Sequence, residues 1–302
     1  MPINTSRHPK TLWPGIQKLA NISYNEHAKE YTFLFDETAS DKRYEEIVQE
    51  IDFGLPAEQS EGSSVTYDVT AEGYTTRITN VSYGLGYIVT REELDDNQYM
   101  QLSSRRAPAL TMSFNQGKET IGGNIYNRAF DSNYTYGDGK ELCATDHPLG
   151  NGGTFSNELD PAADLSHDAL EDLTIQIMGA VNERNLKIRL MPKSLIVPRQ
   201  LWYEANRIIK STLQSGTPNN DMNTLKNVFP GGIVLNHYLT DADAYFIRTD
   251  VPVGEGLIFQ KRIPFEFTQD NDFDTSNAKA KGYERYAFSV HDPRALYASA
   301  GA

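Results

Sequence analysis

The feature that most constrains the fold is an apolar stripe along residues 91–130. Steps near three, four or seven separate its members, which is the period of one face of an α-helix. They are Leu94, Leu102, Ala107, Leu110, Phe114, Ile121 and Ile125. Pro108 and the pair Gly122-Gly123 weaken the pattern. A helix of roughly 35 residues at about 1.5 Å each spans on the order of 50 Å, so we predict a spine and not an ordinary globular helix.

Residues 1–60 carry isolated aromatic side chains among polar residues, glycines and prolines. Such aromatics cannot form a core alone, so we expect an extended arm that docks on this subunit or another. The net charge of the arm changes from positive to negative along its length. Residues 1–20 hold Arg7 and two lysines without an acid, whereas residues 21–61 hold eleven acidic and three basic residues. The arm either lies across a neighbouring subunit of complementary charge or is exposed to solvent. Its candidate contacts with another subunit are Arg7 and Trp13.

Residues 61–90 predict a long β-hairpin. Val65, Tyr67 and Val69 alternate with polar residues, Glu72-Gly73 supplies a turn, and a return strand begins near Arg77. A hairpin of this composition is half covered and marginal alone, so another surface must bury it. The candidate inter-subunit contacts in this segment are Val65, Tyr67, Glu72, Tyr74 and Arg77.

The rest of the chain predicts mixed α/β structure followed by sheet. A Gly/Asn/Asp-rich connection at 131–160 leads to a helix that Ser166 caps and that ends near Asn185. A buried strand at 194–198 precedes a second helix over 201–213. Strands follow at 232–236, 244–249, 256–260, 263–268 and 283–290. We therefore divide the chain at 1–60, 61–90, 91–135, 136–255 and 256–302.

Charge and cysteine content narrow the classes of protein. A net charge of −13 argues against a chain whose main task is to neutralise phosphates. The single cysteine, Cys143, excludes an internal disulfide framework and suits a reducing cytoplasm. No apolar run approaches the roughly 18 residues of a membrane span, so we expect no membrane partner.

Searches for catalytic and cofactor motifs yield little. The chain lacks a Walker A sequence, G-x-G-x-x-G, H-E-x-x-H and G-x-S-x-G, and we expect no cofactor and no enzyme. Cys143 and His147 form a nucleophilic pairing in principle, but we interpret Cys143 as a buried structural residue. Asp270, Asp272 and Asp274 follow one another at two-residue spacing. They are either a solvated turn or a weak cation site shared between subunits.

The order of these elements, and several strings in them, resemble the major capsid protein of tailed bacteriophages. The strings are Tyr83-Gly-Leu-Gly-Tyr-Ile-Val-Thr-Arg-Glu-Glu-Leu-Asp-Asp96, Ala144-Thr-Asp-His-Pro148, Ser194-Leu-Ile-Val-Pro198, Glu284-Arg-Tyr-Ala and Asp292-Pro-Arg-Ala-Leu-Tyr297. The resemblance covers essentially the whole chain. It implies an α+β fold of the Hong Kong 97 type. Its parts are an N-terminal arm, an E-loop hairpin, a P-domain with a long spine helix and a sheet, and an α/β A-domain.

The resemblance also implies a function and partners. The chain would form hexamers and pentamers of an icosahedral head that encloses double-stranded DNA without binding it specifically. Its other partners would be a portal, a separate scaffolding protein or none, and decoration proteins. It would reside in the virion, after assembly in the host cytoplasm. We predict no covalent crosslink between subunits, because the crosslinking residues of some relatives have no aligned counterparts.

Two other readings stay open. One is an encapsulin-like shell, in which a cell uses the same fold to enclose an enzyme. The other is a cytoplasmic enzyme with an unrecognised site in residues 131–160. Nuclease-protected DNA inside purified particles separates the first from a phage head, and particle formation separates both from the second.

Overall fold

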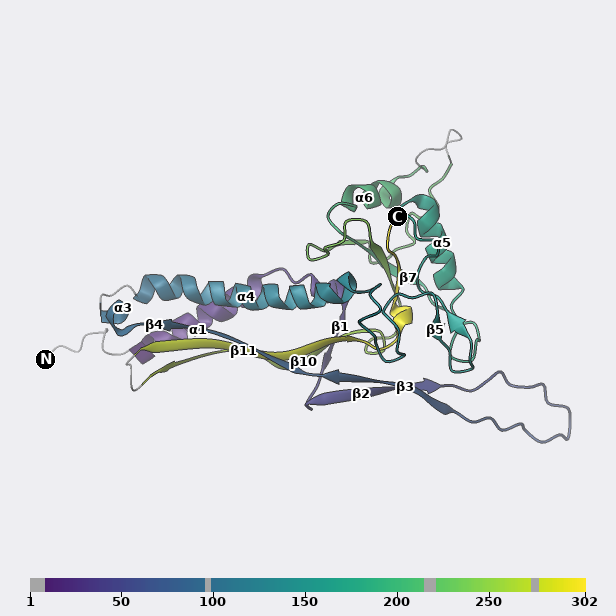
Figure 1. Cartoon of the computed structure of the whole chain (residues 1–302), viewed down its shortest axis with the longest axis horizontal. Coiled ribbons are helices and arrows are strands. Elements are labelled where there is room, and N and C mark those ends of the chain that lie inside the picture. Colours follow the sequence, from purple (N-terminus) through teal and green to yellow (C-terminus); the bar gives the residue numbers. More distant parts are fainter. Residues whose placement is uncertain (1–8, 96–98, 215–220, 273–276) are drawn as a thin grey trace.

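A computed structural model describes residues 9–95, 99–214, 221–272 and 277–302 (Figure 1). The helices are α1 (Pro9–Glu26), α2 (Tyr31–Leu34), α3 (Arg91–Asp95), α4 (Tyr99–Asn127), α5 (His167–Met178) and α6 (Trp202–Lys210), with the 3-10 turn η2 (Pro293–Ala295). The strands are β1 (Asp36–Ala39), β2 (Tyr44–Ile51), β3 (Ala71–Thr79), β4 (Val81–Val89), β5 (His147–Pro148), β6 (Thr154–Phe155), β7 (Pro192–Val197), β8 (Ile233–Leu235), β9 (Tyr245–Thr249), β10 (Leu257–Asn271), β11 (Ala278–Val290) and β12 (Leu296–Ser299). In Figure 1 a long layer of helices and strands lies along the molecule, and a second α/β layer rises at one end of it.

The predicted spine is confirmed. Helix α4 has 29 residues, or roughly 43 Å at 1.5 Å per residue, and continues through Pro108. Its buried face includes Ala107, Leu110 and Phe114. The glycine pair is explained by close packing, since a Cβ at Gly123 would come within 2.9 Å of the Cβ of Tyr238. Residues that weaken the helix locally therefore let it approach its neighbours closely.

Helix α4 lies against a four-stranded sheet of order β1-β10-β11-β4, which we call the spine sheet. Strands β10 and β11 are antiparallel and run along the long axis beside α4 in Figure 1. The strands predicted at 256–260 and 263–268 are one strand, β10, with register shifts between Lys261 and Glu266. The interior of this layer is aromatic, because Phe35, Tyr126, Phe259 and Phe288 pack edge to face or tilted.

The prediction of an extended arm is wrong for residues 9–26, which form helix α1. Ile16 and Ala20 are buried against the spine layer, and the ring of Tyr24 stacks on that of Phe265 at 4.7 Å. These residues follow one another at intervals of four, a helical period that Pro14 and Gly15 obscure in the sequence. The aromatic docking was expected, and the helical backbone was not. Arg7 lies outside the described residues.

A buried ion pair joins α4 to the spine sheet. Lys118 Nζ lies 2.7 Å from Glu284 Oε2, and the two side chains are 5% and 2% exposed. The Tyr24 hydroxyl of α1 accepts a hydrogen bond from Lys118 and donates one to Glu284. Burial lowers the pKa of Lys118, and the Glu284 carboxylate opposes that shift. Three elements thus share one desolvated polar contact.

The second layer is built on a sheet of order β12-β9-β7-β8 that contacts α5 and α6. The predicted cap is confirmed, since the Ser166 side chain accepts a hydrogen bond from Ala169 N. The predicted end of that helix is wrong: α5 ends at Met178, and Asn185 sits in a following turn with φ 61°. Strand β12 pairs with β9, so residues 256–302 do not return as a unit to the spine sheet.

Candidate assembly surface

A hairpin formed by β2 and β3 projects from the body of the molecule (Figure 1). The predicted turn at Glu72-Gly73 is wrong, because Glu72 lies inside β3 and pairs with Glu50 of β2. The connection is instead the loop 52–70, which we call the hairpin tip. Strand β4, which covers most of the predicted return strand, pairs with β11 in the spine sheet. The alternating residues 65–69 lie in the tip without strand structure, because no strand lies opposite them.

The hairpin tip exposes large apolar side chains. They are Phe53, Leu55, Val65, Tyr67 and Val69. Tyr67 is 92% and Leu55 77% exposed, so the body of the subunit leaves them uncovered. An isolated apolar residue on a surface is ordinary, but five on one projecting loop are typical of an interaction surface.

The root of the hairpin is fixed to the body. The Tyr74 hydroxyl donates a hydrogen bond to the carbonyl oxygen of His291 at 3.0 Å, and His291 Nδ1 lies 2.9 Å from Thr76 Oγ1. Burial lowers the pKa of His291, which favours its neutral form. A Cβ at Gly137 would collide with Thr76, so glycine lets that loop close over β3. The root of the hairpin is therefore packed tightly against the body of the subunit.

A second contact holds the two ends of the tip. Arg184, which follows α5, lies 2.9 Å from Asp68 Oδ2 and donates a hydrogen bond to the carbonyl oxygen of Val69 at 2.6 Å. Asp68 also accepts a hydrogen bond from Gly54 N at 2.8 Å. The backbone donors of Gly54 and Val69, together with Arg184, lower the pKa of Asp68. Beyond this clasp, the exposed residues 55–67 extend into solvent.

The predicted contact residues separate into groups. Val65 and Tyr67 lie in the tip, whereas Glu72 and Arg77 are exposed on β3. Tyr74 belongs to the root, where it contacts His291. Trp13 lies in α1, at a position whose side chain the structure does not describe. Phe53 and Leu55 are also exposed in the tip and were not among the predicted contact residues, although an isolated apolar pair beside Gly54 and Pro56 was an available signal.

The connection at 131–160 is held in place by buried side chains and hydrogen bonds. Cys143 is fully buried, as predicted, and burial raises the pKa of its thiol. His147 Nδ1 lies 2.6 Å from Asp138 Oδ2, and its Nε2 lies 3.0 Å from Asn157 Oδ1. Asn157 in turn donates to the carbonyl oxygens of Leu142, Pro293 and Leu296. The imidazole therefore fixes this loop to the chain end and does not activate Cys143.

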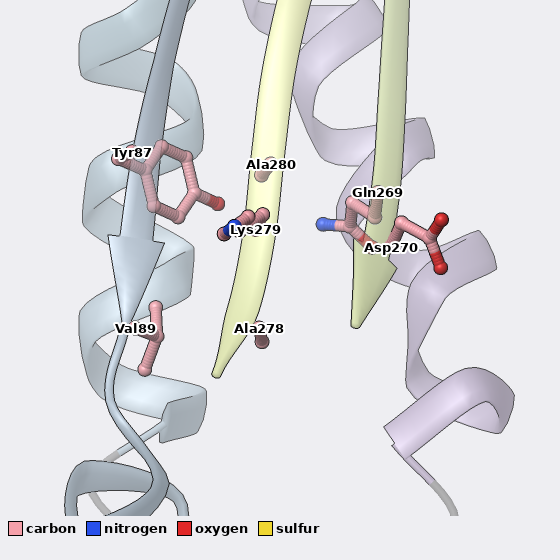
Figure 2. A pocket seen from close by; sticks show the side chains of 7 residues that line it. All are labelled: Tyr87, Val89, Gln269, Asp270, Ala278, Lys279 and Ala280. Carbon is pink, nitrogen blue, oxygen red and sulfur yellow. The ribbon is translucent and has the colours of Figure 1, made fainter. Parts of the chain in front are cut away.

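The three aspartates at the end of β10 do not form a described cluster. Asp270 pairs in register with Lys279 on β11, as seen in Figure 2, and Asp272 Oδ2 lies 2.6 Å from Lys279 Nζ. Asp274 lies outside the described residues. The pocket drawn in Figure 2 has a volume of about 10 Å³, room for about one water molecule.

Within the described part of the chain, none of the helices combines the length and the apolar character that a membrane span requires.

The fold was compared with those of known proteins. Three solved structures share the fold. A virus-like particle from Pyrococcus furiosus is 12% identical, with 94% of this chain and 97% of that one covered and a TM-score of 0.54. The procapsid of bacteriophage JBD30 is 14% identical over 98% and 76%, with a TM-score of 0.53. The capsid of the cyanophage P-SCSP1u is 11% identical over 90% and 87%, with a TM-score of 0.54.

No curated protein matches the sequence. A family model described as "Phage capsid protein" matches residues 73–299, from within β3 to the end of β12. That match takes in β4, α4, the second layer and the long strands of the spine sheet. The chain therefore belongs to the phage capsid protein family.

Proposed function

We propose that the chain is the major capsid protein of a tailed bacteriophage and that its role is structural, not enzymatic. Copies assemble into the hexamers and pentamers of an icosahedral head around double-stranded DNA. The subunit assembles in the host cytoplasm with a portal and with any scaffolding and decoration proteins, and it ends in the virion.

The observation that carries the proposal is the hairpin tip. Its apolar side chains have no cover in a single subunit, while its root is fixed by Tyr74, Thr76 and His291. A rigidly rooted loop with an apolar end suits a contact with the next copy in a ring, where every copy gives and receives the same contact. The net charge of −13 suits a container that encloses DNA without holding it tightly.

A pair of variants in the tip tests this assignment. Replacing Leu55, Val65 and Tyr67 by serine removes exposed apolar area, so we expect a folded subunit, by circular dichroism, that forms no closed shells in electron micrographs. The matched control replaces Glu58, Gln59 and Glu61 by serine in the same loop, and it should still form shells. Normal shells from the first variant would contradict the proposal.

The content of the particles separates the phage head from a cellular shell of the same fold. A head filled during infection protects double-stranded DNA from added nuclease. Particles that instead hold a single copurifying enzyme and no DNA would favour the encapsulin-like reading. The likeness to the virus-like particle from Pyrococcus furiosus concerns the fold and leaves this choice to the measurement.

A further inference from the structure

We propose that His167, Asp168 and Glu171 bind a divalent transition-metal ion of the zinc class at the start of α5. One ligand atom from each residue lies within 4.8 Å of the others. The ring nitrogen is the Nδ1 of His167, which lies 3.4 Å from Glu171 Oε1 and 4.0 Å from Asp168 Oδ1. The i and i+4 positions bring His167 and Glu171 to one face of the helix.

A neighbouring amide orients the imidazole of His167. His167 Nε2 lies 3.3 Å from Asn223 Oδ1. The orientation of that amide is set, because Asn223 Nδ2 donates to the carbonyl oxygens of Ile208 and Ser211 and its Oδ1 accepts from Leu225 N. Nε2 therefore donates its N–H to Asn223, and Nδ1 is the ring nitrogen that faces the carboxylates of Asp168 and Glu171.

The second ring nitrogen of His167, Nδ1, lies beside two carboxylates. The Nδ1 atom is buried and has no hydrogen-bond donor among the described residues. Its nearest charged neighbours are the carboxylate oxygens of Glu171 and Asp168. The two carboxylates repel each other unless a positive charge lies beside them, and either a proton on Nδ1 or a metal ion shared by the three residues supplies that charge. A tetrahedral zinc ion with bonds of about 2.0–2.2 Å places its ligands about 3.3 Å apart, close to the His167–Glu171 spacing.

The supporting contacts match those of metal sites. A metal-bound imidazole commonly donates its second N–H to an oxygen, as His167 does to Asn223. Glu171 Oε1 also accepts a hydrogen bond from Thr224 Oγ1 at 2.6 Å, which orients the carboxylate. Asp168 is 90% exposed, so its side chain is free to rotate inward as a third ligand. One imidazole with carboxylates favours zinc, nickel or cobalt over magnesium or calcium.

Metal titration of the full, tag-free chain tests the site. After treatment with EDTA, we expect one equivalent of Zn²⁺ to bind by calorimetry and to raise the melting temperature. Co²⁺ should give visible absorption bands that Zn²⁺ removes. His167→Gln and Glu171→Gln should each weaken Zn²⁺ binding about tenfold or more. Asp168→Asn, at a position that is 90% exposed, should weaken Zn²⁺ binding to a smaller extent.

The matched control is His237→Gln. His237 Nδ1 also faces a carboxylate, at 2.6 Å from Glu30 Oε1, but on the molecule's surface and with one acid only. It should bind Zn²⁺ like the unaltered chain. The proposal is overturned if the unaltered chain binds neither Zn²⁺ nor Co²⁺ at millimolar concentration, or if His167→Gln and Glu171→Gln both bind as the control does.

Discussion

The spine sheet and the hairpin tip contain similar apolar residues but place them differently. Along the spine, aromatic rings pack between α4 and the strands, and the charged groups Lys118 and Glu284 are buried with each other. In the tip, Tyr67 and Leu55 face solvent, and the ion pair of Arg77 with Glu46 on the adjoining strands is 58% and 45% exposed. The first region holds the subunit together by itself. The second leaves large apolar side chains exposed, which is typical of a surface that associates with another one.

This difference separates the contacts that contribute to the free energy of unfolding from the exposed side chains that we propose serve association. A buried ion pair leaves an uncompensated charge when one partner is removed, whereas an exposed pair is screened by water and salt. The same chemistry in the two regions should therefore respond to mutation very differently.

The largest effect is expected for Lys118→Ala. Removal of the ammonium leaves Glu284 buried without its partner, so the free energy of unfolding should fall by about 3–5 kcal/mol in urea titrations of the purified subunit. Lys261→Ala is the control, because Lys261 pairs with Glu37 at the surface of the same sheet and should cost under about 1 kcal/mol. Equal losses from both variants would erase the contrast between buried and exposed pairs.

A smaller effect is expected from Glu119, which is buried on α4. Burial raises its pKa to about 7, although it accepts hydrogen bonds from Glu30 N and Tyr31 N. A carboxyl pKa raised in the folded state gives stability that is complete below the unfolded pKa and is lost as the pH rises through the folded one. The free energy of unfolding should thus fall by about 2–3 kcal/mol between pH 4.5 and 7 from this group.

Glu119→Gln isolates that contribution. Its amide has one acceptor oxygen for two backbone donors, so we expect a lower stability at acid pH, together with a flatter pH profile. The readout is the difference in slope between the variant and the unaltered subunit, measured by urea unfolding at several pH values. Parallel profiles would show that the pKa of Glu119 is the same in the folded and unfolded states.

The smallest effect is expected in the hairpin. Arg77→Ala removes the 2.8 Å contact with Glu46 and the stacking on Tyr44, yet it should change the free energy of unfolding by less than about 1 kcal/mol. Glu46→Ala serves as the reciprocal control and should behave alike. A loss above about 2 kcal/mol from either would mean that the hairpin contributes to the stability of the isolated subunit, and the comparison of the two regions would need revision.

The sequence predicted the elements whose signals are local. The stripe of α4, the Ser166 cap and the buried strand β7 depend on residues within a few turns or one run. The helix α1 was missed because Pro14 and Gly15 interrupt a short period. The hairpin was predicted at the wrong position in the sequence, because strand pairing depends on segments that are distant in the chain. Strand β3 pairs with β2, which had been assigned to the arm.

The candidate assembly residues were predicted in part for the same reason. Alternation at 65–69 drew attention to Val65 and Tyr67, which the structure exposes in the tip, but alternation does not tell an exposed loop from a half-buried strand. Tyr74 has the composition of a contact residue, and its burial against His291 depends on a residue 217 positions away. The grouping of His167 with Glu171 was within reach of the helical period, whereas the role of Asn223 in fixing the imidazole was not.

The position of His291 has a mechanical consequence. It lies where the chain crosses from β11 in the long layer to β12 in the second layer, three residues before Arg294, whose guanidinium bonds the Val181 carbonyl oxygen and pairs with Asp292. The root of the hairpin therefore contacts the segment that joins the two layers. Through Tyr74 and Thr76, a displacement of the hairpin root acts directly on the segment that joins the two layers.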